Sequence, residues 1–231
     1  MKLPKKDMWF ILAAYNEEKQ ISNILQELKK EGYSNIIVID DGSTDNTHDK
    51  AKKQGVIVLQ HKINRGQGAA LRSGTEYALQ HKAKYIIHFD ADGQHRVEDI
   101  PAMMQPLLTK KVEIVLGSRF IDKNKKTKMP LKRKLYIKGG LIFTKIMTGL
   151  KLTDTHNGFR AMTAETAKKL EITQDDMEHA SEILELIARQ KIKYKEVAVI
   201  INYNDEVMQN SMNSFAKGIK IILKTIHYKL K

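Results

Sequence analysis

The feature that most constrains the fold is an alternation, over the first half of the chain, between short apolar runs and longer amphipathic segments. The apolar runs cover residues 8–14, 35–40, 56–60, 84–90 and 112–117. The segments between them, most with apolar residues spaced about 3.6 apart, cover residues 18–32, 44–55, 66–81 and 97–111. Strands that alternate with helices in this way predict an α/β fold with a mostly parallel sheet and helices on both of its faces.

Four of the apolar runs end in polar clusters. The sequence AAYNEE follows the first run, DDGSTD the second, DADGQ the fourth and GSR the fifth. In a parallel sheet these clusters all leave the carboxyl ends of strands, where open α/β sheets bind their ligands. The alternation therefore predicts one binding site, built from four loops at one edge of the sheet.

The composition sets limits on the function. The chain has 231 residues, 42% of them hydrophobic, which suits one large domain or a domain with a small appendage. Its net charge of +13 indicates an anionic partner, for which nucleic acid, an acidic membrane surface and a phosphorylated substrate are the candidates. The chain has no cysteine, which excludes disulfides, thiolate catalysis and cysteine-bound zinc.

The apolar content of the chain does not predict a membrane span. The first 18 residues have the basic start and apolar run of a signal peptide, but the run is short and passes directly into YNEE, which favours a buried strand. We find no uninterrupted apolar stretch of about 18 residues, so no transmembrane helix is expected.

The second half of the chain is more basic. Residues 122–134 hold seven Lys or Arg after a single acid and predict a mobile basic loop. Helices are expected at 135–149 and 178–190, and a strand at 194–203. Residues 206–231 form a separate tail, whose apolar stripe with lysines opposite suits a helix lying in a membrane interface or docked on the protein's own core.

The acidic cluster DADGQ has two interpretations. Asp90, Asp92 and Gln94 alternate along an extended segment, so their side-chain oxygens can turn toward one hard cation, for which Mg²⁺ or Mn²⁺ fits. Such an ion keeps waters and shares a diphosphate. The alternative is a capped turn before a helix that begins near Val97, with Gly93 at its corner. From the residues alone both interpretations stay open.

Two further motifs carry less information. DDGSTD places Asp41 at the end of a neighbouring strand, where an acidic side chain of a nucleotide-binding fold commonly holds a base or ribose. Its alternative is a plain strand-to-helix connection. RGQGAALRSG lacks the GK[ST] of a phosphate-binding loop, so we interpret its glycines as a tight turn with close helix packing, and leave open whether Arg65 or backbone N–H groups line the pocket.

Six motifs together resemble a known family. AAYNEE, VIDDGSTD, NRGQGAALRSG, FDADGQH, GSRF and DTHNGFRAM stand in the order and spacing of family 2 glycosyltransferases. The chain is most similar to the bacterial polyprenyl-phosphate glycosyltransferases and the dolichyl-phosphate mannose synthases, over residues 8–205. The resemblance implies a Rossmann-like GT-A domain at 1–205, with an acceptor-side loop and helix near 120–160. It also implies a nucleotide-sugar donor, a divalent metal and inversion at the anomeric carbon.

The resemblance implies roles for individual residues. The nucleotide-sugar site is expected at Ala13, Tyr15, Glu17, Asp41, Asp90, Ala91 and Arg160. The metal is expected at Asp90, Asp92 and Gln94, and the lipid phosphate at Arg119 and Arg133. The residues expected to act in catalysis are Asp92, Arg119, Arg133 and Asp154. Ala13 replaces a proline common in the family, and the QxxRW motif of processive enzymes is absent, with EHASEILEL in its region, which argues against a polymerising synthase.

A phosphate acceptor would change the demands on catalysis. The second pKa of a phosphate is about 6, as in phosphoamino acids, so the acceptor is largely ionised at neutral pH. It therefore needs positively charged side chains that bind and orient it rather than a strong base. Arg119 and Arg133 suit that role, and Asp154 would orient the acceptor or balance arginine charge. His179 and Glu182 either line the acceptor side or cap and solvate a helix.

We therefore expect an inverting, metal-dependent transferase that moves one glucose or N-acetylglucosamine from a UDP-sugar to undecaprenyl phosphate. It would act on the cytoplasmic face of the cell membrane, for modification of a cell-surface polysaccharide. GDP-mannose as donor and a non-lipid glycan as acceptor are the alternatives. An anionic membrane surface is the expected partner, while a small membrane protein and a second copy of the chain are left open. Nucleic acid is not expected, because aromatic residues make up 6% of the chain and the basic loop has none.

Overall fold

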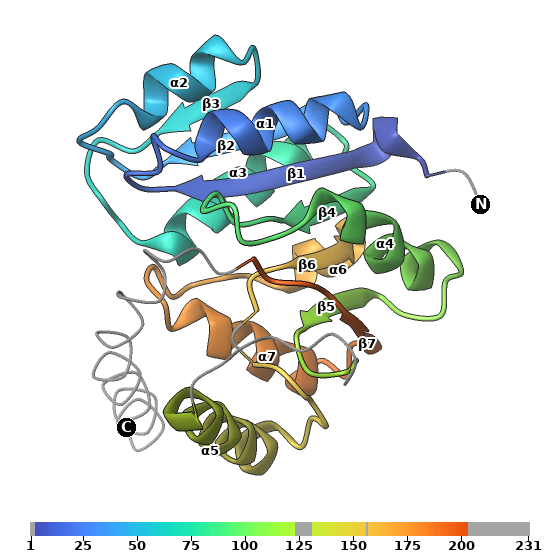
Figure 1. Cartoon of the computed structure of the whole chain (residues 1–231). Helices are drawn as coiled ribbons and strands as arrows, with labels where there is room; N and C mark the ends of the chain where they lie inside the picture. The colour runs from blue at the N-terminus through green and yellow to red at the C-terminus, as the bar shows by residue number, and fades with distance from the viewer. Residues whose placement is uncertain (1–2, 123–130, 156, 203–231) are drawn as a thin grey trace.

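The computed structural model describes residues 3–122, 131–155 and 157–202, without the side chains of 131–138 and 143. These residues form one seven-stranded sheet in the order β3-β2-β1-β4-β6-β5-β7 (Figure 1). The strands are β1 (Met8–Ala14), β2 (Asn35–Asp40), β3 (Ile57–Gln60), β4 (Tyr85–His88), β5 (Ile114–Ser118), β6 (Arg160–Thr163) and β7 (Tyr194–Ala198). The helices are α1 (Ile21–Lys30), α2 (Thr47–Lys53), α3 (Gln67–Gln80), α4 (Ile100–Leu108), α5 (Leu131–Thr148), α6 (Ala164–Lys169) and α7 (His179–Arg189), with short 3₁₀ turns at Lys5–Asp7 and Val97–Asp99.

One strand runs against the others. β6 pairs antiparallel with both β4 and β5, whereas the pairs β1–β2, β1–β4, β2–β3 and β5–β7 are parallel. The residues that precede β6 therefore reach the same sheet edge as the residues that follow the other strands. Arg160, the first residue of β6, lies beside His88 of β4 and Leu116 of β5 in the pairing register.

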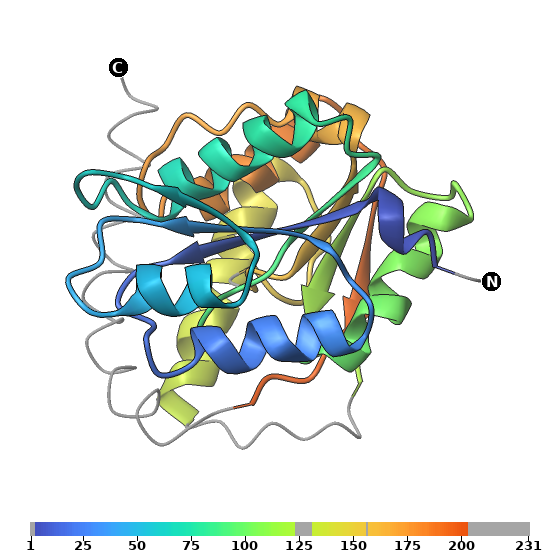
Figure 2. The same ribbon diagram turned by 90° about the horizontal axis from the view of Figure 1, so that it is seen from above.

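The two faces of the sheet carry separate hydrophobic clusters, because side chains alternate between faces along each strand. On β1, Phe10 and Leu12 belong to the cluster that includes α1, α2 and α4, whereas Ile11 belongs to the one that includes α3, α6 and α7. Figure 2 shows α1 and α2 on one side of the sheet and α3 on the other. α5 packs against α7, outside this layer of helices.

The predicted α/β fold with a mostly parallel, doubly covered sheet is confirmed, and three of its details were wrong. β6 was not expected, because this four-residue strand includes Arg160 and lacks a long apolar run. α5 begins at Leu131, so residues 131–134, expected in a mobile loop, are helical; Leu, Lys and Arg are strong helix formers. The strand expected at 194–203 ends at Ala198, and Ile201 makes an isolated bridge with His95.

Other predictions fall on parts of the chain that are not described. Residues 123–130 of the basic loop and the tail at 206–231 lie outside the described residues, so the amphipathic tail helix and the division after residue 205 stay predictions. Across the part of the chain that the structure describes, no helix combines the length and the apolar character needed to cross a bilayer. α5 has 18 residues, but its sequence LKRKLYIKGGLIFTKIMT is interrupted by basic side chains.

Candidate active site

The loops that follow β1 and β2 are joined by hydrogen bonds. Asn16 N–H donates to Ser43 Oγ at 3.0 Å, and Glu17 N–H donates to Thr47 Oγ1 at 2.8 Å. Asn16 has a φ of 56°, a left-handed conformation that asparagine adopts more readily than most residues. Two of the four predicted polar loops therefore form one wall, on which Tyr15 is exposed.

Four carboxylates converge beside this wall. Burial, followed by repulsion from Asp92, Asp45 and Asp90, raises the pKa of Glu17 to about 7. Asp45 is fixed in place because its Oδ2 accepts from Glu18 N–H at 3.1 Å. Like charges gathered this closely favour a bound cation, which would neutralise them.

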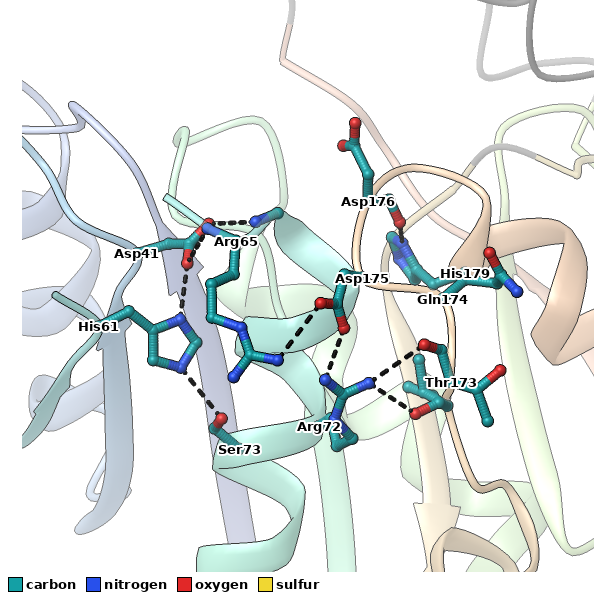
Figure 3. A network of polar contacts seen from close by, with 12 residues as sticks. Asp41, His61, Arg65, Arg72, Ser73, Thr173, Gln174, Asp175, Asp176 and His179 are labelled. Atoms are coloured by element: carbon teal, nitrogen blue, oxygen red, sulfur yellow. Dashed lines mark hydrogen bonds and ion pairs between the residues drawn. The ribbon is translucent and has the colours of Figure 1, made fainter. Parts of the chain in front are cut away.

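Asp41 lies buried between the second loop and the start of α3 (Figure 3). Its Oδ1 contacts His61 Nδ1 at 2.6 Å and accepts from Arg65 N–H at 3.0 Å, and its Oδ2 accepts from Gly66 N–H at 2.7 Å. His61 Nε2 in turn contacts Ser73 Oγ at 3.0 Å. The carboxylate predicted to face a nucleoside thus also fastens the loop before α3 to the sheet.

Asp90, just past the end of β4, is enclosed by three parts of the chain. Gln67 Nε2, at the start of α3, donates to Asp90 Oδ1 at 3.2 Å, and His95 Nε2 contacts Oδ2 at 2.8 Å. Gly158 gives the carboxylate room, since a Cβ there would lie 2.4 Å from Oδ2. Burial raises the pKa of Asp90, but His95 and Arg160 outweigh it, so the pKa lies below its ordinary value. Asp90 is therefore a fixed anion.

Gln67 and His95 were not among the predicted site residues. His95 directly follows DADGQ in the sequence, so the motif could have pointed to it. Gln67 stands 23 residues before Asp90, and no feature of RGQGAALRSG connects it with the acidic cluster.

Asp92 and Gln94 form the turn that follows Asp90. Gln94 N–H donates to Asp92 Oδ1 at 3.0 Å, and the side-chain amide of Gln94 contacts Asp92 Oδ2. The capped-turn interpretation is thus correct as geometry, with Gly93 at a φ of 77°. Burial, followed by the charge of Asp90, raises the pKa of Asp92, so the two carboxylates lie close enough to repel each other. Ala91 between them is buried and belongs to the hydrophobic cluster that includes α1, α2 and α4.

These residues also fit a divalent metal. Asp90, Asp92 and the amide oxygen of Gln94 are the hard oxygen donors that Mg²⁺ and Mn²⁺ prefer. Burial, and after it repulsion from neighbouring carboxylates, raises the pKa values of Glu17 and Asp92, and a bound cation would relieve that repulsion. Within the described residues, no three His, Asp or Glu side chains form a complete chelate, so a bound ion would complete its shell with water and diphosphate oxygens.

Arg119, after β5, and Asp154 form a buried ion pair. Nε and Nη2 of Arg119 donate to the two carboxylate oxygens of Asp154 at 2.6 and 2.7 Å. Glu196 of β7, which the sequence did not mark, fixes the loop carrying Asp154 by accepting from Thr153 N–H at 2.8 Å and Asp154 N–H at 3.0 Å. The guanidinium fork expected to hold a lipid phosphate is thus directed at Asp154. Arg133 lies in the first turn of α5, and its side chain is outside the described part of the structure.

Arg160 lies buried at the start of β6, where the charges of Asp90 and Asp154 both act on it. Burial and this guanidinium lower the pKa of His88 to about 3 and of His179 to about 4, so both imidazoles are neutral at pH 7. Among the described residues, Nη1 of Arg160 has no hydrogen-bond partner. An exposure of 3% places the side chain beneath the surface of the site.

The segment before α7 packs directly on the start of α3 (Figure 3). Asp175 accepts from Arg72 Nη2 at 2.5 Å and from Arg65 Nη2 at 3.3 Å. A Cβ on Gly66 or Gly68 would lie 2.4 or 2.1 Å from backbone oxygens of this segment. The glycines thus serve a tight turn and close packing, as predicted. Arg72 and its partner Asp175 are 103 residues apart in the sequence.

His179 and Glu182 are both used within the protein. His179 is buried, and its Nδ1 contacts Asp176 O at 2.7 Å. Glu182 accepts from the N–H groups of Thr173 and Gln174, each at 3.0 Å, which closes the turn before α7. These contacts favour the structural alternative over a place on the acceptor side.

Comparison with known proteins gives the family. Residues 9–171 match the family model described as Glycosyl transferase family 2. The chain is 32% identical over 244 residues to a UDP-N-acetylglucosamine–dolichyl-phosphate N-acetylglucosaminyltransferase of Methanococcus voltae, with 97% of each chain covered. It is 31% identical over 168 residues to an undecaprenyl-phosphate mannosyltransferase of Micrococcus luteus, with 70% of this chain and 68% of the relative covered.

Among solved structures, the glucosyl-3-phosphoglycerate synthase of Mycobacterium tuberculosis, in complex with Mg²⁺ and uridine diphosphate, has a similar fold. The TM-score is 0.64 at 19% identity, and the match covers 86% of this chain and 71% of the synthase chain. The sheet and its covering helices thus form the GT-A fold that the six motifs implied. Because the family model spans residues 9–171, well over half of the chain, the protein belongs to glycosyl transferase family 2 and is a glycosyltransferase.

Proposed function

We propose that the protein transfers a single sugar from a UDP-sugar to a polyprenyl phosphate, with inversion at the anomeric carbon. The observation that carries the proposal is the ion pair of Arg119 and Asp154. Asp154 is the carboxylate expected on the acceptor side, and two short hydrogen bonds commit it to a guanidinium. A carboxylate so engaged is a poor base, which favours an acceptor that arrives already ionised. A phosphate is ionised at neutral pH, whereas a sugar hydroxyl is not.

The two relatives support this class of acceptor. One is named for dolichyl phosphate and the other for undecaprenyl phosphate, and they differ in sugar, N-acetylglucosamine in one and mannose in the other. The relative covered over 97% of its length is the one that uses a UDP-sugar. We therefore favour UDP-N-acetylglucosamine or UDP-glucose as donor and undecaprenyl phosphate as acceptor, with GDP-mannose as the alternative donor.

The chain's own residues would supply binding and orientation. Asp90, Asp92 and Gln94 would hold Mg²⁺ or Mn²⁺, which as a Lewis acid stabilises the charge on a departing diphosphate. Asp154 keeps the guanidinium of Arg119 in one orientation, with its charge beside the approaching acceptor. An acceptor phosphate oxygen then forms a bond to the anomeric carbon while the bond from that carbon to the UDP oxygen breaks. No proton has to be removed in this step.

The charge of the chain supports a location at the membrane. Lysine and arginine side chains near an anionic bilayer each contribute about 1 kcal/mol of attraction, and the net charge is +13. A polyprenyl phosphate also presents its head group at that surface. We propose peripheral attachment to the cytoplasmic face, with the lipid-linked sugar serving the modification of a cell-surface polysaccharide.

One experiment tests donor, metal and acceptor together. The purified full chain is incubated with Mg²⁺ or Mn²⁺, anionic vesicles containing undecaprenyl phosphate, and UDP-N-acetylglucosamine, UDP-glucose or GDP-mannose in separate reactions. We expect a lipid-linked sugar by mass spectrometry with a UDP-sugar, and none with EDTA or with undecaprenol in place of its phosphate. Product on a soluble glycan, with none on the lipid phosphate, would overturn the proposal.

A further inference from the structure

The ring of His95 lies in an aromatic pocket next to Asp90. Its side chain is 3% exposed. The ring centroid lies 5.5 Å from that of Phe89 and 5.2 Å from that of Phe159, and these two phenylalanines meet edge to face with centroids 5.1 Å apart. Aromatic packing of this kind requires a ring but not the polar nitrogens of a histidine, so packing alone does not account for a histidine here.

The two ring nitrogens of His95 are used unequally. Nε2 lies 2.8 Å from Asp90 Oδ2. Nδ1 is buried, and among the described residues it has no hydrogen-bond partner. An unpartnered buried polar atom costs about 1–3 kcal/mol. The unpartnered Nδ1 of His95 therefore lowers the stability of the protein. The polar contact that only a histidine ring provides here is the one between Nε2 and Asp90.

The backbone around His95 and the far side of Asp90 are fixed as well. His95 forms an isolated bridge with Ile201, and Asn202 N–H donates to Gln94 O at 2.9 Å. On the opposite side Gln67 Nε2 donates to Asp90 Oδ1 at 3.2 Å. Both oxygens of Asp90 are thus held, by donors from two different parts of the chain.

We infer that His95 is a positioning residue, whose Nε2–H holds the Asp90 carboxylate in the orientation that binds the metal and nucleotide. The inference rests on the proposed function, in which Asp90 belongs to the donor site. A carboxylate that is free to rotate must be ordered when the ligand binds, and this weakens binding. Loss of such an outer hydrogen-bond partner typically lowers metal affinity or activity by about 10–100-fold.

Two substitutions of His95 separate its hydrogen bond from its packing. His95→Phe keeps a ring between the two phenylalanines and loses the donor. His95→Gln loses the ring, but its Nε2 can donate to Asp90. The probe is UDP with Mn²⁺, titrated calorimetrically, and thermal unfolding is measured without ligand. We expect His95→Phe to bind at least about 10-fold more weakly with its unfolding midpoint unchanged or raised, and His95→Gln to keep most of the binding with its midpoint lowered.

Gln67→Met provides a check that leaves His95 in place. It removes the longer of the two hydrogen bonds to Asp90, and a loss of a few-fold in Mn²⁺-dependent UDP binding is expected. The inference is wrong if a folded His95→Phe binds as the unmodified protein does, or if His95→Gln binds as weakly as His95→Phe. If the unmodified protein itself binds no UDP with Mn²⁺, the proposed donor site fails, and the inference fails with it.

Discussion

At the scale of single residues, the main interaction of Asp154 is its ion pair with Arg119. Its carboxylate and the guanidinium of Arg119 are both buried and share two short hydrogen bonds. A buried pair of this kind adds little net stability, yet removal of one partner leaves an uncompensated charge and costs about 3–5 kcal/mol. We therefore interpret the pair as a means of orienting the guanidinium of Arg119 and not as a source of stability.

Asp154→Asn tests this role. We expect the free energy of unfolding to fall by about 3–5 kcal/mol, because Arg119 loses its counter-charge, while transfer to undecaprenyl phosphate slows but stays measurable. Urea unfolding and initial rates of lipid-linked product give the two quantities. Asp175→Asn is the control. The side chain of Asp175, which pairs with Arg72, is 44% exposed, so this substitution should lower the free energy of unfolding by less than about 1 kcal/mol. Complete loss of transfer in folded Asp154→Asn would count against a role limited to orienting Arg119.

Glu17 should make the stability of the metal-free protein depend on pH. Burial and three neighbouring carboxylates raise its pKa from 4.5 to about 7, so the folded protein binds this proton more tightly than the unfolded chain does. The folded state therefore loses stability as the pH rises from about 4.5 to about 7. Because Glu17 is only partly buried, we expect a contribution of about 1 kcal/mol.

In EDTA, Glu17→Gln should thus be more stable than the unmodified protein at pH 8 and no more stable at pH 5, as measured by urea unfolding. Mg²⁺ should reduce the difference at pH 8, because a bound cation favours the ionised form of Glu17. Equal stability of the two proteins at both pH values would show that burial and the neighbouring carboxylates do not disfavour the ionised form of Glu17 as the structure indicates.

At the scale of elements, the start of α3 depends on the absence of side chains. A Cβ on Gly68 would lie 2.1 Å from Gln174 O, whereas a Cβ on Gly139 of α5 would meet nothing within 4 Å. We expect Gly68→Ala to lower the free energy of unfolding by about 2 kcal/mol or more through this clash. Gly139→Ala, also in a helix, should be neutral or stabilise by up to about 1 kcal/mol. If urea unfolding showed equal effects of the two substitutions, α3 would not be packed on residues 174–176 in solution.

Elements with a periodicity of their own were predictable from the sequence. β1 to β4 and α1 to α4 lie within the apolar runs and amphipathic segments from which they were predicted, and β5 extends one residue beyond its run, to Ser118. β6 has four residues and gains its stability from pairing with β4 and β5, which no local pattern reveals. Its antiparallel direction also explains how the polar stretch DTHNGFRAM arrives at the same edge as the other loops.

Some residues of the candidate site could likewise be predicted from the sequence, and others could not. Asp90, Asp92 and Arg119 follow strands, so their place at the sheet edge could be predicted from the order of the apolar runs. The hydrogen-bond partners of these residues could not be predicted, because the topology of the sheet brings them together. Gln67 and Asp90 are 23 residues apart in the sequence, and Asp154 and Arg119 are 35 apart. The burial of Arg160, which is only 3% exposed, is likewise a property of the assembled sheet and not of its motif.

At the scale of the whole molecule, charge is distributed unevenly across the site. The acids that lie close together come from the loops after β1, β2 and β4, and they are Glu17, Asp45, Asp90 and Asp92. Arg119 and Arg160 stand on the side of β5 and β6. A cation is therefore favoured on the half of the edge that holds these four acids, whereas on the other half Asp154 lies beside the two arginines and Glu196 contacts the backbone of Asp154. That arrangement suits a reaction in which a metal-bound diphosphate leaves.

The same arrangement sets how the whole molecule responds to acid. His88 and His179 are buried near Arg160, and their pKa values are lowered from 6.5 to about 3 and about 4. Below about pH 6.5 the unfolded chain binds protons at these residues that the folded protein does not, so the free energy of unfolding falls as the pH drops. At pH 5 each histidine should lower it by on the order of 2 kcal/mol relative to pH 7.

His179→Gln should remove one of these contributions. Between pH 7 and pH 5, we expect the variant to lose about 1–2 kcal/mol less of its unfolding free energy than the unmodified protein, measured by urea unfolding at both pH values. His81→Gln, at an exposed histidine, is the control for replacing a histidine by glutamine outside the site. Glu17 acts in the opposite direction over part of this range, so the difference between proteins is the decisive quantity and not the slope of either one. An identical pH dependence in His179→Gln would mean that burial and the charge of Arg160 do not hold this imidazole neutral in the folded protein.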